Sequence, residues 1–276
     1  MPGEIKIARA LLGHDLVYGM AARLFYLVYG IYCVLKYGCY DFFWSVNLEI
    51  STFCNRRCYY CPNSENPTPD EYMPEELFRH IIEDLRAIDY RGAISYQFYG
   101  EPLLDPRLVG FIRYTKEHLP KAMFIKVVSN GDYLTMDLFE KLIEAGMTEI
   151  NVTIHDRDPD RMAAKLAPMI EKHPGNIRVT SIHGSPALSN RGGAIKIVNE
   201  RPKRRCVYSR NAVVDHEGNV LLCCNDYFYS RKFGKVTEES ILDIWKKDEF
   251  RKIRKAARRG KPPIKICRDC LLQGSP

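Results

Sequence analysis

The sequence predicts an α/β protein whose main part is a partial (β/α)6 barrel, a TIM-like barrel that is open on one side. Stretches of strand length alternate with stretches of helical periodicity over residues 45–195, which is typical of a parallel sheet with crossover helices. A full barrel of eight units takes about 250 residues, so a region of about 150 residues holds only five or six units. We therefore expect the barrel to be incomplete.

The expected strands are apolar or alternate between apolar and polar residues, and they lie at 45–51, 93–100, 123–131, 149–156 and 177–183. The helix expected at 74–88 places its leucine and isoleucine residues on one face. The same periodicity predicts helices at 105–119, 135–147 and 158–174. Asp105, Thr135 and Asp158 are suited to begin these three helices, and Gly146 is suited to cap the end of the helix at 135–147.

Residues 1–44 form an N-terminal segment of a different character, rich in tyrosine and aliphatic residues. A pair of amphipathic helices is the favoured structure, and an interfacial membrane helix is the alternative. The longest uncharged run, between Arg23 and Lys36, has twelve residues, whereas a bilayer span needs about 20. We expect no transmembrane segment, no signal peptide and a cytoplasmic location.

Residues 196–276 form the expected C-terminal domain, after residues 45–195 have formed the barrel. A basic stretch at 201–206 leads to a strand, a turn at Glu217–Asn219 and a second strand that ends at two adjacent cysteines. Residues 239–260 have the periodicity of one long helix, and a Cys-x2-Cys pair follows. This domain is therefore predicted to be a small hairpin-plus-helix extension.

The composition excludes several classes of protein. Hydrophobic residues make up 46% and charged residues 27%, which is ordinary for a globular protein and excludes a disordered or multi-span membrane chain. The net charge of +7 favours anionic partners only weakly. The ten cysteines are mostly clustered, and without a secretion signal they indicate metal binding rather than disulfides.

Three of these cysteines follow the first expected strand. Cys54, Cys58 and Cys61 form a C-x3-C-x2-C motif, and three thiolates this close can bind one face of a cuboidal iron–sulfur cluster. Most 4Fe–4S clusters have four thiolate ligands, so three would leave one iron open to another ligand. A structural zinc knuckle is the alternative, but the sequence nearby supplies no fourth ligand.

This motif, with Tyr60 as the aromatic residue before the third cysteine, resembles that of the radical SAM superfamily. The resemblance implies that S-adenosylmethionine (SAM) binds the open iron and is reductively cleaved. The resulting 5′-deoxyadenosyl radical then abstracts hydrogen from a substrate. It also implies an electron-donating reductase such as flavodoxin or ferredoxin.

Other strand ends carry weaker parts of the same resemblance. Gly100 and Glu101 resemble the family's Gly-Gly-Glu motif, with a tyrosine in the first place, and the Glu101 carboxylate would accept from the SAM ammonium group. Ser129 and Asn130 resemble the family's contact with the SAM ribose and carboxylate. His155 is a candidate catalytic residue at the fourth strand end, with a structural histidine as the alternative. Each pattern also fits an ordinary turn after a strand.

The remaining cysteine cluster resembles the SPASM and twitch extensions of radical SAM enzymes. The resemblance implies that Cys206, Cys223, Cys267 and Cys270 hold one auxiliary 4Fe–4S cluster, and a four-cysteine zinc site is the alternative. The Gly-x4-Cys spacing selects Cys223 as the ligand over Cys224. Cys224 is then the odd thiol, which is either packed or a candidate hydrogen donor to a substrate radical. Arg191 and Asp226 are further candidates for the substrate cavity.

These observations favour a redox enzyme that acts on a small polar metabolite, such as a sugar or an anion, by dehydrogenation or epimerisation. The alternative is a peptide-modifying radical SAM maturase with a peptide as its substrate. A remote alternative is a zinc-dependent nucleic-acid-binding protein that would use the basic stretches RPKRR (201–205) and KIRKAARRGK (252–261). No aromatic residues are interleaved with these basic stretches.

Overall fold

A computed structural model describes residues 27–155, 158–182, 189–196 and 205–271, and the chain forms two compact units, residues 1–42 and 43–276. In the first unit residues 27–37 are helical, which agrees with the expected amphipathic helices. Any helix before residue 27 lies outside the described residues. Cys33 and Cys39 are buried, and the Tyr37 ring stacks on Phe42 at 3.7 Å. Within the described part of the chain, no helix is both long enough and apolar enough to span a bilayer.

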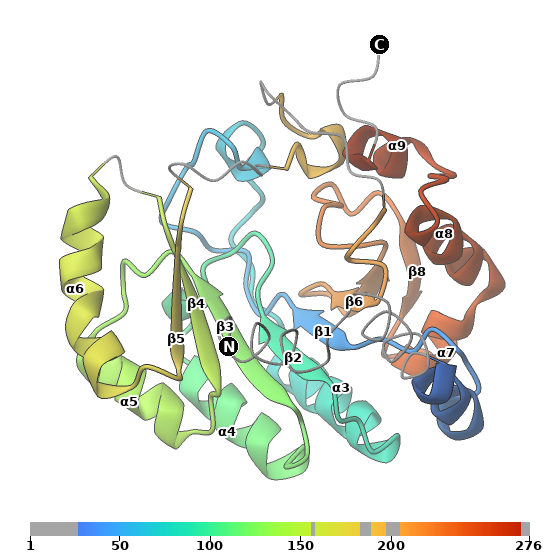
Figure 1. Ribbon diagram of the computed structural model, residues 1–276, viewed down its shortest axis with the longest axis horizontal. Coiled ribbons are helices and arrows are strands. Elements are labelled where there is room, and N and C mark those ends of the chain that lie inside the picture. Colours follow the sequence, from blue (N-terminus) through green and yellow to red (C-terminus); the bar gives the residue numbers. More distant parts are fainter. Residues whose placement is uncertain (1–26, 156–157, 183–188, 197–204, 272–276) are drawn as a thin grey trace, which may run out of the picture. The chain divides into compact units, whose positions relative to one another are not determined.

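The second unit is built on one eight-stranded sheet in the order β5-β4-β3-β2-β1-β6-β7-β8 (Figure 1). Neighbouring strands from β5 to β6 are parallel, whereas β6, β7 and β8 are antiparallel. The strands are β1 (Ser45–Leu48), β2 (Ala93–Tyr96), β3 (Phe124–Ser129), β4 (Glu149–Ile154), β5 (Ile177–Ser181), β6 (Asn211–Val214), β7 (Asn219–Leu221) and β8 (Lys232–Lys235). Five parallel strands thus come from the expected barrel region, and the sheet is not closed.

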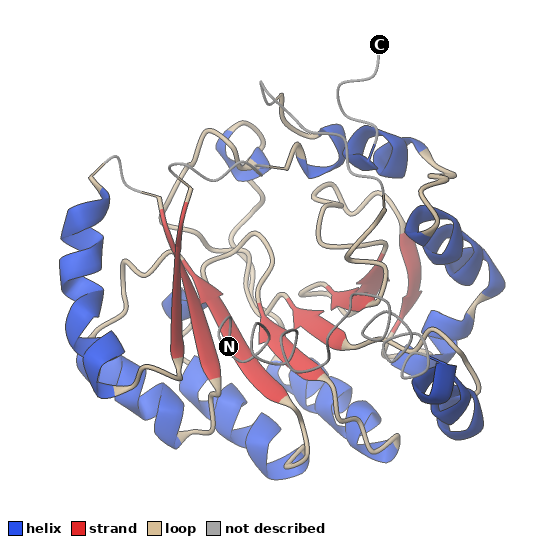
Figure 2. Cartoon of the chain, in the orientation of Figure 1, coloured by secondary structure: helices blue, strands red, loops and turns tan. Residues whose placement is uncertain are grey.

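Helices cover the outer side of the parallel strands (Figure 2). They are α3 (Glu75–Ala87), α4 (Leu108–His118), α5 (Met136–Glu144) and α6 (Pro159–Lys172), and short 3-10 turns η1 (Pro62–Ser64), η2 (Pro102–Leu104) and η3 (Arg191–Gly193) lie in the connections. Thr135 and Asp158 cap α5 and α6 as predicted, each accepting a backbone N–H bond, and Gly146 follows α5 with φ +108°. Asp105 does not begin α4. It ends η2, and its carboxylate accepts from the Arg107 backbone N–H instead.

The C-terminal region differs from its prediction in three places. The single long helix expected at 239–260 is two helices, α7 (Ile241–Lys246) and α8 (Asp248–Arg258), because the backbone of Lys247 leaves the helical region with ψ 132°. The short strand β8 was not expected. The Cys-x2-Cys pair lies on a helix, α9 (Lys265–Leu271), so Cys267 and Cys270 are one helical turn apart. The predicted turn is present, and Gly218 supplies its φ of +88°.

The two faces of the parallel sheet differ in chemistry. The outer face is apolar and packs on the helices, and the Tyr96 hydroxyl reaches Thr115 and the Phe111 carbonyl in α4. The alternate residues Asn47, Ser95, Lys126 and Glu149 lie beside one another in register on the opposite, inner face. Lys126 and Arg178 both pair with Glu149, at 3.0 and 3.1 Å. The inner side of the open barrel is therefore polar.

Strand β6 joins the C-terminal region to the barrel. Residues Ser45–Leu48 of β1 pair in parallel with Asn211–Val214 of β6 on one edge and with β2 on the other (Figure 1). The hairpin β6–β7 then continues the same sheet. Side chains at the carboxyl ends of β1 and β6 are consequently brought together.

Candidate active site

The first cysteine group lies on the loop between β1 and η1. Burial raises the pKa of the Cys54 and Cys61 thiols, and each of these thiols is within electrostatic reach of Cys58. The backbone N–H groups of Arg56 and Asn63 donate hydrogen bonds to Cys54 and Cys61 respectively. All ten cysteines are free thiols. The loop thus presents three sulfur ligands together, with backbone donors that stabilise their thiolate forms.

A latch, which we define as Asn55, Arg56, Asn130 and Asp132, ties this loop to the end of β3. Arg56 donates two hydrogen bonds to Asp132, at 2.7 and 2.5 Å, and Asn55 donates a third at 2.6 Å. Asn130 donates to the Asn55 side chain at 2.9 Å. Bonding to Arg56 lowers the pKa of Asp132, so the carboxylate is ionised at neutral pH. Sequence reasoning missed Asn55, Arg56 and Asp132, because their pairing joins segments about 75 residues apart.

The structure brings Glu101, Ser129 and Asn130 together, as expected. The buried Glu101 carboxylate accepts from the Ser129 hydroxyl at 2.7 Å, from the Asn130 backbone N–H at 2.7 Å and from the Leu103 backbone N–H at 3.1 Å. Burial raises the pKa of Glu101, and these donors oppose that effect. A carboxylate has about four lone-pair sites, so one more donor can still be accepted.

Gly100 is required by a close approach of backbone to backbone. A Cβ atom at this position would lie 2.1 Å from the Ser51 carbonyl oxygen and 3.1 Å from that of Phe53. The next residue, Glu101, donates its N–H to the Phe53 carbonyl at 2.5 Å. Only glycine allows the loop after β2 to pack on the start of the cysteine loop.

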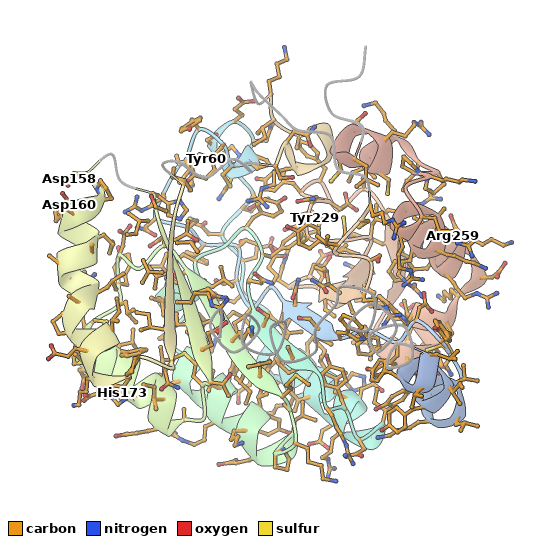
Figure 3. All side chains as sticks on the ribbon, in the orientation of Figure 1. Tyr60, Asp158, Asp160, His173, Tyr229 and Arg259 are labelled. Carbon is orange, nitrogen blue, oxygen red and sulfur yellow. The ribbon has the colours of Figure 1, made fainter. Side chains whose placement is uncertain are left out.

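His155 follows β4 and meets the cysteine loop. Its Nδ1 atom is hydrogen-bonded to the Tyr60 hydroxyl, and the two rings are 5.8 Å apart and nearly parallel. Burial raises the pKa of Tyr60. Figure 3 shows Tyr60 near the upper ends of β4 and β5 in that view. His155 is therefore at the site, where its ring contacts Tyr60, and its catalytic role stays a prediction.

The second cysteine group consists of the five remaining cysteines of the second compact unit, Cys206, Cys223, Cys224, Cys267 and Cys270. Cys223 is within electrostatic reach of Cys206 and Cys267, and Cys224 is within reach of Cys206 and Cys270. Burial raises the pKa of Cys224 to about 11 and that of Cys267 to about 12. The Asn225 amide donates to the Cys270 sulfur at 3.3 Å, and the Asn225 backbone N–H donates to Cys223. Cys223 and Cys224 thus both lie near the other thiols that are expected to bind the auxiliary cluster.

Arg191 and Tyr99 lie between the two cysteine groups. The Arg191 guanidinium carbon is 5.8 Å from the centre of the Tyr99 ring, and both residues are within electrostatic reach of Cys61 and Cys224. Among the described residues, nothing bonds to the buried Arg191 Nε atom or to the buried Tyr99 hydroxyl. Two polar groups that point to a missing partner thus lie between the two sets of thiols.

A cavity of about 430 Å³ adjoins this point. Its lining includes Arg191, Asn225, Asp226, Tyr227, Ile266 and Asp269. The Asp226 carboxylate accepts from the backbone N–H groups of Ser230 and Arg231 and from the Ser230 hydroxyl, so it shapes the loop after the cysteine pair. Both residues that the sequence suggested for a cavity therefore line one.

The alternatives given above were a zinc site at the cysteines and nucleic-acid binding through the two basic stretches. No three His, Cys, Asp or Glu side chains in the described ranges are grouped so that they could hold one metal ion. The thiolates of a cuboidal cluster, in contrast, bind separate irons at different corners. Residues 201–204 of the RPKRR stretch lie outside the described residues, and the second basic stretch includes most of α8.

Comparisons with known proteins support an iron–sulfur role for both cysteine groups. Residues 48–183 match the radical SAM superfamily model, and residues 206–271 match a SPASM model, described as an iron–sulfur cluster-binding domain. The chain is 34% identical over 232 residues to the S-adenosyl-L-methionine-dependent 2-deoxy-scyllo-inosamine dehydrogenase of Niallia circulans, which covers 82% of this chain and 91% of that protein.

Solved structures of radical SAM enzymes also resemble this chain. A crystal structure of BtrN in complex with AdoMet and 2-DOIA matches with a TM-score of 0.76 and 32% identity, over 83% of this chain and 92% of that chain. Streptococcus suis SuiB bound to precursor peptide SuiA matches with a TM-score of 0.55 at 12% identity, over 86% of this chain and 73% of that chain. The latter similarity concerns the fold alone.

Proposed function

Since this chain belongs to the radical SAM superfamily, we propose that it is a dehydrogenase that oxidises a secondary alcohol of an aminocyclitol or a closely similar polyhydroxylated small molecule. As a family member it is an oxidoreductase that uses SAM and iron–sulfur clusters and abstracts hydrogen from a small polar metabolite. The aminocyclitol class is proposed because the relative that matches over most of its length acts on 2-deoxy-scyllo-inosamine. A donor of the flavodoxin or ferredoxin class, a cytoplasmic location and the domain limits at residues 44 and 195 belong to the same proposal.

The donor sets suit the two kinds of cluster. Cys54, Cys58 and Cys61 would hold three irons and leave the fourth for SAM, whereas Cys206, Cys223, Cys267 and Cys270 would complete an auxiliary cluster. The first cluster with SAM supplies the hydrogen-abstracting radical, and the auxiliary cluster supplies a one-electron acceptor. The backbone donors at Cys54, Cys61 and Cys223 support thiolate ligands in both places.

The residues at the ends of β2 and β3 are suited to orient SAM. The Glu101 carboxylate has room for one more donor, which the SAM ammonium group would supply as a charge-assisted bond. Ser129, Asn130 and Gly100 keep this carboxylate in place and close to the cysteine loop. Tyr60, held by His155, would border the same position from the other side.

The observation that carries the substrate class is the pair Arg191 and Tyr99. The buried Arg191 Nε atom and the buried Tyr99 hydroxyl lack hydrogen-bond partners among the described residues, and both residues lie within electrostatic reach of both cysteine groups. A hydroxylated ring bound here would accept from Arg191 and bond to Tyr99, which would satisfy both. The reacting carbon would then lie between the source of the radical and the electron acceptor.

Dehydrogenation is favoured over epimerisation by the auxiliary site. Epimerisation needs a hydrogen donor to the substrate radical, and Cys224, which is within electrostatic reach of Arg191 as well as of Cys206 and Cys270, is the candidate. A site with four thiolates suits an acceptor for the electron that dehydrogenation releases, and the relative that matches over most of its length is a dehydrogenase.

The test uses the reconstituted enzyme with SAM, dithionite and 2-deoxy-scyllo-inosamine carrying deuterium at the carbinol carbon to be oxidised. We expect deuterated 5′-deoxyadenosine and a ketone, formed in equal amounts, and neither product from a Cys58→Ala control. Deuterium uptake from heavy water without a ketone would indicate the epimerase. Unlabelled 5′-deoxyadenosine with no change in the compound would exclude this substrate class.

A further inference from the structure

A hydrogen-bonded network of four side chains, which we define as Tyr229, Glu49, His216 and Glu71, lies outside the groups used above. The Tyr229 hydroxyl donates to the Glu49 carboxylate, with distances of 3.0 and 3.1 Å to its two oxygens. His216 Nδ1 is 3.1 Å from Glu49, and His216 Nε2 is 2.7 Å from Glu71. The Glu49 side chain is 1% exposed, whereas that of Glu71 is 52% exposed. The network therefore runs from the interior to the surface.

The network lies at the end of the barrel where the cysteine loop begins. Glu49 directly follows β1, and His216 follows β6. Glu49 is two residues beyond Asn47, which places it on the polar inner side of the sheet. Parallel barrels build their active sites at these carboxyl ends of the strands.

The Tyr229 end is linked through the Phe98 ring to Tyr99, the aromatic residue beside Arg191. The Tyr229 ring is 5.9 Å from Phe98, and Phe98 is 4.7 Å from Tyr99. Figure 3 shows Tyr229 in the interior, between the barrel strands and the C-terminal region. Tyr229 also has φ +50°, a left-handed backbone that costs a bulky residue roughly 1–2 kcal/mol and that clusters at functional sites.

Oxidation of an alcohol releases a proton as well as an electron, and the proton needs an acceptor. We propose that Tyr229 and Glu49 accept the hydroxyl proton of the substrate, and that His216 is a positioning residue that keeps Glu49 ionised. This inference rests on the proposed dehydrogenase function. After hydrogen abstraction from the carbinol carbon, the substrate O–H bond breaks and its proton passes to the Tyr229 oxygen. Tyr229 gives its own proton to Glu49 and the carbonyl bond forms. An auxiliary iron–sulfur cluster held by Cys206, Cys223, Cys267 and Cys270 would supply the acceptor for the one electron that this oxidation releases.

The charges around the network suit this role. Burial raises the pKa of Glu49, which makes it a stronger base than an exposed carboxylate, while hydrogen bonds from His216 and Tyr229 favour its ionised form. Asp215 and Tyr227 also act on these groups, and Glu217 lies within electrostatic reach of His216. The Asp215 oxygens already accept from the backbone of Glu217 and from Asn219, so that carboxylate serves the turn. Glu49 is thus a buried carboxylate that accepts a hydrogen bond from the phenol group of Tyr229.

The experiment compares Tyr229→Phe and Glu49→Gln with the parent enzyme and with Tyr96→Phe. Tyr96 is a matched control because it is a buried, hydrogen-bonded tyrosine on the outer face, in contact with α4. Each protein receives SAM, dithionite and the carbinol-deuterated inosamine. The measurements are iron content, deuterium in 5′-deoxyadenosine, ketone formed per 5′-deoxyadenosine, and the electron paramagnetic resonance signal of the substrate radical.

We expect both network variants to keep their iron and to label 5′-deoxyadenosine with deuterium, because hydrogen abstraction precedes proton loss. The yield of ketone per 5′-deoxyadenosine should fall at least tenfold, the substrate radical should accumulate, and the yield should recover as the pH is raised. Tyr96→Phe should keep the parent yield. A parent-like yield in both network variants would overturn the proposal.

If a variant loses iron, the radical is followed in the parent enzyme instead. Its decay should be slower in heavy water than in ordinary water, and an equal decay rate would contradict proton transfer at this step. Failure of the proposed function is distinguishable, since the parent itself would then transfer no deuterium from this compound to 5′-deoxyadenosine.

Discussion

The hydroxyl of Ser129 donates a 2.7 Å hydrogen bond to the buried carboxylate of Glu101. The residues that end β2 and β3 are therefore one hydrogen-bonded unit rather than two separate turns. Because Asn130 also belongs to the latch on the cysteine loop, a change at either strand end is transmitted to the cluster ligands.

Replacing Glu101 with Gln should weaken SAM binding more than cluster assembly. A bond from the SAM ammonium group to a carboxylate is charge-assisted and contributes about 1.5–3 kcal/mol, so its loss corresponds to about tenfold or more in affinity. Equilibrium binding of SAM to the reconstituted protein measures this, with iron content as the check on assembly. The exposed Glu76→Gln is the matched control. An unchanged affinity in Glu101→Gln would remove Glu101 from the SAM site.

Replacing Cys58 with Ala should abolish formation of 5′-deoxyadenosine under dithionite and leave much of the auxiliary cluster absorbance. Two thiolates cannot replace three on the SAM-binding cluster, while the second cysteine group is untouched. Product analysis and the visible spectrum measure the two effects. Cys39→Ala, in the first compact unit, serves as the control. Retained SAM cleavage in the Cys58 variant contradicts the assignment.

Replacing Gly100 with Ala should disrupt the site, whereas Gly110→Ala should not. The Gly100 Cβ would meet the Ser51 carbonyl oxygen at 2.1 Å, so the backbone must shift and move Glu101 away from the cysteine loop. Nothing lies within 4 Å of a Cβ at Gly110, in the first turn of α4, where alanine favours the helix by up to about 1 kcal/mol. SAM affinity and thermal unfolding of both variants test this contrast. An equal SAM affinity and an equal melting temperature in the two variants would refute it.

Removing Cys223 should cost about half of the iron and destabilise the C-terminal region, because metal binding is coupled to folding. Removing Cys224 should keep both clusters. Iron and sulfide analysis of the two alanine variants distinguishes them. The opposite pattern, iron lost from Cys224→Ala alone, would make Cys224 the ligand, and the hydrogen-donor hypothesis for Cys224 would lapse.

Stability should depend on His216 above neutral pH. Hydrogen bonds to Glu49 and Glu71 raise the pKa of His216 from 6.5 to about 9, against the opposing effect of burial. Because the folded-state pKa is the higher one, this stabilisation is complete below about pH 6.5 and is lost as the pH rises through about 9. The imidazole protons, followed by NMR, should titrate near 9 in the parent and at a lower pH in Glu49→Gln, where Glu71 is the one carboxylate of the pair that still bonds to the ring. The melting temperature of His216→Gln should decline less between these pH values.

Local features of this protein were predictable, and long-range pairings were not. The cysteine spacing, the caps at Thr135 and Asp158 and the five barrel strands follow from patterns within a few residues. The continuous helical periodicity at 239–260 gave no sign of the break at Lys247, since the break is a backbone change at one residue that leaves the pattern intact.

The residues of the site divide in the same way, into local features that were predictable and long-range pairings that were not. Glu101, Ser129 and Asn130 were expected at one place because parallel strands end at the same edge. The Arg56–Asp132 ion pair and the Glu49–His216 contact depend on which loops meet, and surface-like Asp, Glu and His residues carry no signal of their partner in the sequence. The pairing of β6 with β1 was missed for the same reason.

That pairing has a consequence for electron transfer from a substrate beside the first cysteine group to the expected auxiliary cluster. Tunnelling rates fall steeply with distance, so a donor and acceptor on separately mobile bodies would exchange electrons at rates that vary with every hinge motion. Here the loop that carries Cys54 leaves β1, while Cys223 follows the β6–β7 hairpin, and β1 and β6 are neighbours in one hydrogen-bonded ladder. We therefore expect the shared sheet to hold the two cysteine groups at a constant distance. Removal of the C-terminal region would leave β1 as an open edge of the sheet.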